Sequence, residues 1–215
     1  MQKINQAPKD SSVLLMAQMA FLTAIMLVMA FTPLGYIPLP FMNATTMHIP
    51  VIIGACLLGP KAGGALGGIF GITSVVKATI QPNITSFVFT PFYSLSPEFH
   101  GGFQSLIVAV LPRILIGIVS GYGFLFFKKR MKGLSLPLLL SGFIGSMVNT
   151  IGVMSLIYLL FGEQYARAGG TDPSLLFGVI MGVVGLNGIP EALIAALLTQ
   201  AAGRALFASK EAFSR

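Results

Sequence analysis

The sequence predicts an all-helical membrane protein, and three features of its composition lead to that prediction. Apolar residues make up 55% of the 215-residue chain and charged residues only 9%, whereas soluble domains carry about 25% charged residues. Glycine is abundant, with 25 residues, which suits close helix packing in lipid. The apolar residues are gathered into long runs, so the composition excludes both an ordinary soluble fold and a disordered chain.

Six apolar runs predict six membrane-spanning helices in a single integral membrane domain, residues 1–215. A helix needs roughly 20 residues to cross a hydrocarbon core of about 30 Å. The second run is short, so we expect it to tilt, to bend at Pro50 or to pack against other helices. The fifth is long enough to tilt or to project from the bilayer. The predicted spans are residues 13–31, 47–58, 62–80, 105–127, 134–161 and 174–207.

The positive charges predict the orientation of these spans. Ten of the 13 Lys and Arg residues lie on the side that holds both chain termini, and the loops of the other side hold only Arg167. Short cytoplasmic loops carry an excess of Lys and Arg, so we expect a multi-pass protein of the cell membrane with both termini in the cytoplasm. Because the cations lie between apolar runs, the net charge of +7 does not indicate nucleic-acid binding.

Two loops on the predicted outer side, residues 33–46 and 81–104, are rich in aromatic residues and proline and nearly without charge. In one interpretation they fold back as lids over a cavity, and Asn43 and Tyr93 are then candidate ligand contacts. In the other they form an aromatic belt at the membrane interface. The sequence leaves both interpretations open.

Polar side chains within the spans indicate where a ligand would bind, because each is costly in lipid unless it has a partner or faces water. Most of them fall in the outer half of the predicted bundle. They are Lys77, Arg113, Asn149 and Asn187 within spans, with Asn43, Thr46 and His48 at the outer end of the second span. Their similar depth in five segments predicts an outward-facing cavity with cationic groups for an anion.

Each of these residues also has a structural interpretation. Lys77 can reach the outer headgroups, Arg113 can pair with Glu191, and the asparagines can join helices by hydrogen bonds. His48 is more often a packing residue than a ligand contact. Glu191 follows Pro190, where the helix loses a backbone bond, and we favour a structural role for it.

The motifs of common enzymes are missing from the sequence. The two histidines, His48 and His100, and the single cysteine, Cys56, do not have the spacing of a metal site. The glycines of residues 67–71 lack the GK[ST] ending of a phosphate-binding loop. We therefore expect no enzymatic activity, no metal and no other cofactor. Uphill transport would need an ion gradient or a partner protein.

Small residues mark two helices for close approach by a neighbour. In the first span, Ala17, Ala20 and Ala24 share one helical face, which makes them candidates for a docking surface. The third span is rich in glycine, and here we favour packing inside the protein. The glycines are Gly63, Gly64, Gly67, Gly68 and Gly71.

Three stretches of the sequence resemble the S component of energy-coupling factor (ECF) vitamin transporters. The first is AFLTA at residues 20–24, an AxxxA pattern. The second is HIPVIIGACLLGPKAGGALGGIFGITS at residues 48–74, and the third is SFVFTPFYS at residues 86–94, followed by LPRILIG at 111–117. The similarity runs over residues 13–207 and is strongest to the pantothenate and hydroxymethylpyrimidine branch.

The resemblance implies a six-helix S-component bundle that binds a vitamin from outside with high affinity. It also implies two kinds of partner, a membrane T component and two cytoplasmic ATPases, with Ala17, Ala20 and Ala24 as the docking face. Members of the family are thought to topple in the bilayer with the vitamin bound. In this scheme the chain has no ATPase motif of its own.

The polar residues favour pantothenate as the vitamin. Arg113 or Lys77 would hold its carboxylate, and the asparagines at 43, 149 and 187 would serve its amide and hydroxyls. Hydroxymethylpyrimidine or pyridoxine would need less cationic charge. Two other hypotheses remain open at this point: a stand-alone proton-coupled transporter with Glu191 or His48 as relay, and a structural protein without a ligand.

Overall fold

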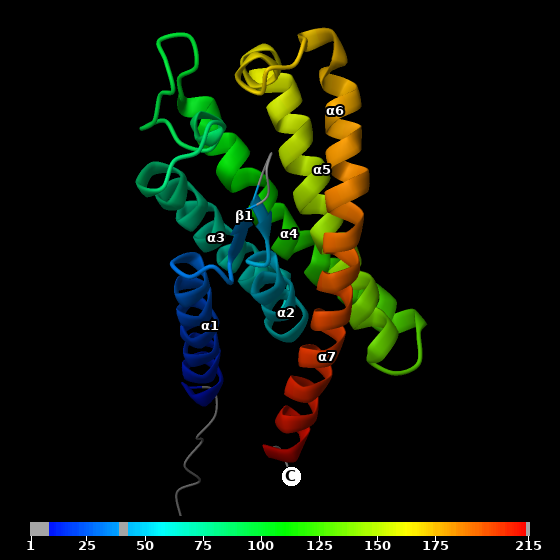
Figure 1. Cartoon of the computed structure of the whole chain (residues 1–215). Coiled ribbons are helices and arrows are strands. Elements are labelled where there is room, and N and C mark those ends of the chain that lie inside the picture. The colour runs from blue at the N-terminus through cyan, green and yellow to red at the C-terminus, as the bar shows by residue number, and fades with distance from the viewer. Residues whose placement is uncertain (1–8, 39–42, 214–215) are drawn as a thin grey trace, which may run out of the picture.

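The computed structural model describes the backbone of residues 9–38 and 43–213 and the side chains of residues 12–35 and 45–209. This part of the chain folds into a helical bundle with one small hairpin (Figure 1), which confirms the predicted all-helical class. Its elements are α1 (Lys9–Ala30), β1 (Tyr36–Pro38), β2 (Asn43–Thr45), α2 (His48–Leu58), α3 (Pro60–Ile80), η1 (Ser86–Val88), α4 (Phe103–Arg130), α5 (Ser135–Ala168), η2 (Pro173–Leu175), α6 (Leu176–Val183), η3 (Val184–Gly188) and α7 (Ile189–Phe213).

Within the described residues, five helical segments are long and apolar enough to cross a membrane. Four are α1, α3, α4 and α5, and the fifth runs through η2, α6, η3 and α7. The helix α2 is a shorter apolar helix of 11 residues. Six helical segments thus match the six predicted spans, and the short one is the second, as the sequence indicates.

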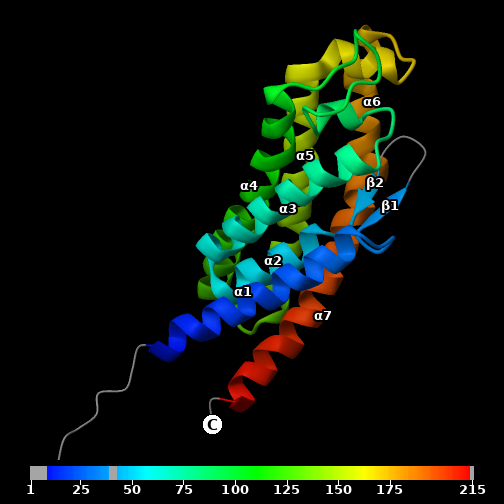
Figure 2. The same ribbon diagram turned by 90° about the vertical axis from the view of Figure 1, so that its left-hand side faces the viewer.

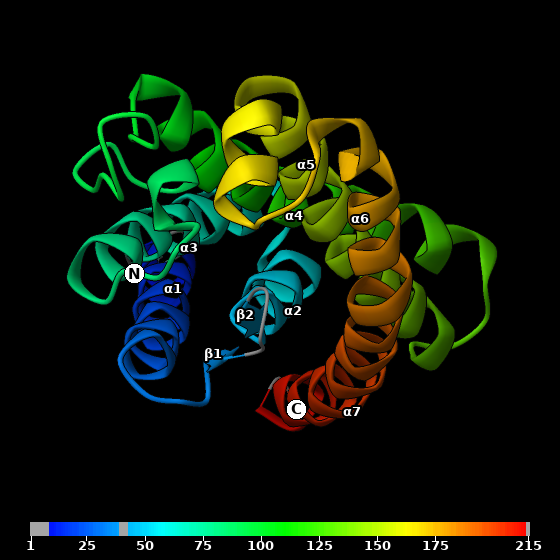
Figure 3. The ribbon, with the colours of Figure 1, turned by 45° about the horizontal axis from the view of Figure 1, so that its top comes forward.

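The helix α2 lies at the centre of the bundle rather than at its edge. At 1.5 Å per residue it is about 16 Å long, roughly half the thickness of the hydrocarbon core. Every residue from His48 to Cys56 is buried, and in Figure 3 the longer helices of the bundle lie around α2. Ile52 packs in a cluster with Phe70 of α3 and Phe124 of α4. Of the three interpretations of this short span, packing against protein is the one that fits.

The helices α3 and α4 cross at very short range because both present glycine at the crossing. A Cβ on Gly71 would lie 2.8 Å from the Cα of Val110, and one on Gly121 would lie 2.7 Å from the Cα of Pro60. Gly67 is equally confined, since a Cβ there would meet the backbone oxygen of Arg113. The glycines of α3 therefore serve internal packing, as favoured from the sequence.

The helix α5 continues beyond its predicted end at residue 161 and reaches Ala168. The added turns are polar, and Glu163 pairs with Arg167 one turn later on their exposed surface. The helix stops before Gly170, whose φ of +69° is a left-handed conformation that glycine adopts readily. Its 34 residues extend about 50 Å, so α5 exceeds the hydrocarbon core.

The outer loop of residues 33–46 contains a feature that the sequence did not reveal, a two-stranded antiparallel hairpin. Tyr36 pairs with Thr45 and Pro38 with Asn43. At the base of the hairpin the Thr46 hydroxyl donates a hydrogen bond to the Leu34 carbonyl oxygen. Figure 3 shows the hairpin beside α2, between α1 and α7.

The first described turn of α1 and the last turn of α7 lie at the same end of the molecule (Figures 1 and 2). The loop between α4 and α5 also lies toward this end, while the segment from α3 to α4 and the α5–η2 turn lie at the other (Figure 1). With both ends of the described chain at one end of the molecule, the chain runs between the two ends of the molecule an even number of times.

Candidate binding cavity

A cavity lies among the hairpin, the segment after α3 and the helices α3, α4, α5 and α7. Its volume is about 90 Å³, and on the same measure roughly 10–15 Å³ suffices for one water. Most of the residues that line it have polar side chains. They are Thr45, Ser74, Lys77, Gln81, Asn83, Thr85, Ser86, Arg113, Asn149, Thr150, Tyr165, Asn187 and Glu191.

Arg113 is the most buried cation of this lining, with 5% of the residue exposed. Its Nη1 donates a hydrogen bond of 2.8 Å to the Val108 carbonyl oxygen. That oxygen lies four residues before Pro112, which has no N–H to bond it. The guanidinium carbon also lies 5.5 Å from the centre of the Phe70 ring and 5.4 Å from that of Phe89. Local sequence and packing together fix this guanidinium at the cavity.

Lys77 brings a second cation to the same cavity from α3. It is partly buried, and its ammonium donates a hydrogen bond to the Gln81 side-chain oxygen one turn later. Gln81 lines the cavity as well. The lysine is therefore held beside the cavity at the outer end of α3, where its contact with Gln81 is exposed.

Asn149 and Asn187 reach the cavity from α5 and from η3, a single turn of π-helix. Asn149 is buried, and its Oδ1 has no hydrogen-bond partner among the described residues. Beside it, a Cβ on Gly188 would lie 2.8 Å from the Thr150 Cγ2, so glycine lets η3 approach α5. Pro190 lacks the N–H that would continue regular α-helical bonding here, and π turns often occur at functional sites.

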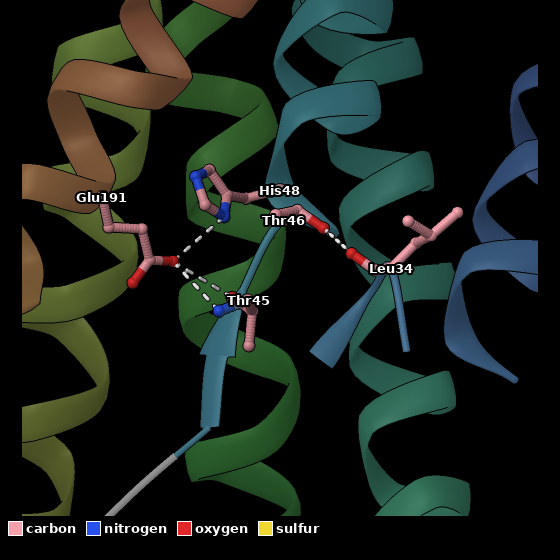
Figure 4. Close-up of polar contacts among 5 residues, drawn as sticks. All are labelled: Leu34, Thr45, Thr46, His48 and Glu191. Atoms are coloured by element: carbon pink, nitrogen blue, oxygen red, sulfur yellow. Dashed lines mark hydrogen bonds and ion pairs between the residues drawn. The ribbon is translucent and has the colours of Figure 1, made fainter. Parts of the chain in front are cut away.

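Glu191 is also part of the cavity wall and holds the hairpin in place (Figure 4). Its Oε1 accepts hydrogen bonds from the Thr45 backbone N–H at 3.3 Å and from the Thr45 hydroxyl at 3.4 Å. The same oxygen lies 3.5 Å from His48 Nδ1. These contacts join α7 to the hairpin and do not involve the backbone beside Pro190, where the sequence favours a structural role, and Glu191 also lies at the cavity.

The structure brings four of the predicted site residues together at the cavity: Lys77, Arg113, Asn149 and Asn187. Two others do not line it. His48 is fully buried behind Glu191, because it begins the central helix α2. Tyr93 packs instead against the outer apolar cluster that contains Phe87. The side chain of Asn43 lies outside the described residues.

Sequence reasoning missed several polar groups of the lining. Gln81 and Asn83 come from the outer loop that follows α3, Thr45 from the hairpin, and Tyr165 from the last turns of α5. The available signal was the amide- and hydroxyl-rich composition of the two outer loops. Both loops contribute lining residues, as the lid interpretation expects. Within the described residues, no group of three or more His, Cys, Asp or Glu could hold a metal ion.

Comparison with known proteins identifies the family. The family model for the substrate-specific component of ECF transporters matches residues 14–202. "Pantothenic acid transporter PanT" of Lactococcus lactis subsp. cremoris is 35% identical over 194 residues, which cover 90% of this chain and 92% of that protein. "Pantothenate transporter PanT" of Leuconostoc mesenteroides is 31% identical over 195 residues, covering 86% and 88%. This chain, a multi-pass membrane protein, therefore belongs to the family of substrate-specific components of ECF transporters, which are transport subunits and not enzymes.

Proposed function

We propose that this chain binds pantothenate in the cavity and delivers it across the cell membrane as the substrate-specific subunit of an ECF transporter. Two relatives that match most of the chain are named as pantothenate transporters, which supports this substrate. The observation that carries the proposal is the buried guanidinium of Arg113 at the wall of a cavity within an apolar bundle. A group so expensive to bury in a membrane protein serves a function by default.

The charges of the lining fit a ligand with one negative charge. Lys77 and Arg113 are cationic and Glu191 is acidic, so with all three ionised the lining carries one excess positive charge. Pantothenate is a monoanion whose carboxylate matches the planar donors of arginine. The partnerless Oδ1 of Asn149 is suited to accept a hydrogen bond from the ligand amide or hydroxyls.

Hydroxymethylpyrimidine and pyridoxine are the alternative ligands, and a binding experiment separates them. Purified protein in detergent is titrated calorimetrically with pantothenate, hydroxymethylpyrimidine and pyridoxine. The proposal expects tight binding of pantothenate and at least 100-fold weaker binding of the two other compounds, roughly the effect of leaving a buried cation unpaired. Equal or tighter binding of either competitor would replace pantothenate as the substrate.

The proposed partners are a membrane T component and two cytoplasmic ATPases. The ATPases would supply the energy for transport, since the sequence of this chain contains no ATPase motif. Ala17, Ala20 and Ala24 are exposed on α1, and the opposite side of the helix packs into the core through Leu22 and Met26. A face of small residues lets another helix approach closely. With both termini in the cytoplasm, as the positive charges indicate, the single membrane domain would present this face to the T component within the bilayer.

A stand-alone proton-coupled transporter is the second candidate, favoured by one observation. His48 Nδ1 and Glu191 Oε1 lie 3.5 Å apart, and Glu191 lines the cavity. Uptake of labelled pantothenate in cells that lack the ATPase partners tests it. The ECF proposal expects no uptake above background in these cells, whereas a proton-coupled transporter would still accumulate the label.

A further inference from the structure

Glu191 presents its two carboxylate oxygens to different surroundings. Its Oε1 accepts two hydrogen bonds from Thr45 and lies 3.5 Å from His48 Nδ1, and the positive charge of Arg113 also acts on the carboxylate. In Figure 4 the second oxygen, Oε2, points away from Thr45 and His48. Glu191 belongs to the cavity lining, and its side chain is 16% exposed, which leaves room for a bound molecule to approach the carboxylate.

A carboxylate oxygen in this position selects for a particular ligand chemistry. An ionised carboxylate only accepts hydrogen bonds, so it rewards a hydroxyl or N–H donor and repels a second anionic group. Hydrogen bonds to a charged group are stronger than those between neutral groups. The cavity wall therefore combines two opposite requirements, an anion for Arg113 and Lys77 and a neutral donor for Glu191.

We propose that Glu191 is a specificity-determining residue, whose Oε2 accepts a hydrogen bond from a hydroxyl of the bound acid while its Oε1 anchors the hairpin through Thr45. The inference rests on the proposed function, because pantothenate supplies both the carboxylate and the hydroxyls. One side chain then connects the ligand to the hairpin, so binding stabilises the position of β2 beside the cavity.

A cycle that combines one protein substitution with the removal of one ligand hydroxyl tests this directly. Calorimetry measures the affinity of the unsubstituted protein and of Glu191→Gln for pantothenate and for its two singly deoxygenated analogues. Removal of the hydroxyl that reaches Glu191 is expected to weaken binding to the unsubstituted protein roughly ten-fold or more. The same removal should change the affinity of Glu191→Gln by less than about three-fold, because the charge-assisted bond is already lost.

The control is Glu163→Gln, which removes the same charge from an exposed residue paired with Arg167 on α5. It should reproduce every affinity of the unsubstituted protein. Thermal unfolding in detergent establishes that Glu191→Gln is folded.

Three outcomes separate the inference from the proposed function. Failure of the unsubstituted protein to bind pantothenate overturns the proposed function and the inference with it. If pantothenate binds but both deoxygenated analogues bind equally well, the inference alone is overturned, without use of any variant. If hydroxyl removal and Glu191→Gln change the binding free energy additively for both analogues, Glu191 is an anchor for the hairpin and does not contact the ligand.

Discussion

Arg113 compensates for a backbone bond that its own neighbour removes. The guanidinium donates to the Val108 carbonyl oxygen at 2.8 Å, the oxygen that the missing N–H of Pro112 leaves without its usual helical partner. Pro112 leaves a carbonyl oxygen of α4 without its helical donor, and Arg113 supplies that donor beside the cavity. The local bonding of the helix therefore accounts for an arginine directly after a proline in this span, and the proposed function gives the same side chain a second role.

Replacing Arg113 with alanine should abolish pantothenate binding, because the carboxylate would lose its buried cation. We expect at least a 100-fold loss of affinity by calorimetry, the order measured when one member of a buried charge pair is removed. Thermal stability in detergent should fall moderately, since the lost hydrogen bond is to a charged group and such bonds contribute about 1.5–3 kcal/mol. Binding that persists within a few-fold would show that the carboxylate is held elsewhere.

Replacing Asn149 with leucine distinguishes a ligand contact from a bond between helices. The Asn149 Oδ1 is buried without a partner among the described residues, so an apolar side chain of similar size should not lower the unfolding temperature. Pantothenate affinity should fall roughly ten-fold, as one hydrogen bond is lost. A clear drop in unfolding temperature with unchanged affinity would instead make Asn149 a structural residue.

Gly67→Ala should destabilise the crossing of α3 and α4, because the new Cβ would meet the backbone oxygen of Arg113. We expect a lower unfolding temperature and weaker pantothenate binding together, since displacement of α4 also displaces Arg113. Gly68→Ala is the matched control, as its Cβ would find the nearest atom, Ile114 Cγ1, at 3.9 Å. Equal behaviour of the two variants would argue against backbone contact at this crossing.

Larger residues on the exposed face of α1 should block assembly without changing the vitamin site. Ala20→Leu combined with Ala24→Leu is expected to prevent copurification with the T component and ATPases and to stop uptake in cells. Pantothenate affinity of the isolated chain should remain within two-fold, a difference of about 0.4 kcal/mol. The control is Ala201→Leu, at an exposed position on α7. Normal assembly of the doubly substituted protein would place docking on another face.

The membrane architecture and four cavity residues could be predicted because both depend on depth in the bilayer. Apolar runs fix the spans, and each intramembrane polar group must find a partner or water. From these constraints Lys77, Arg113, Asn149 and Asn187 were expected at similar depth, and all four line the cavity. Their role in binding the ligand stays a prediction.

The rest of the site depends on tertiary contacts that a sequence pattern does not contain. The hairpin strands are three residues each, too short for an alternating pattern, and β2 is positioned by Glu191 from a helix 146 residues later. The π turn of Val184–Gly188 depends on its packing against Thr150 as well as on Pro190. His48 and Tyr93 were expected at the site from their location along the chain. Tyr93 packs against an apolar cluster instead, and His48 lies beside Glu191.

The most direct test of the central claim is mass spectrometry of the small molecules that copurify with the protein from cells grown with pantothenate. We expect pantothenate to be released in near-stoichiometric amount from the unsubstituted protein and to be absent from Arg113→Ala. Stoichiometric release of hydroxymethylpyrimidine or pyridoxine, or equal recovery of pantothenate from both proteins, would contradict a cavity built around Arg113 for this acid.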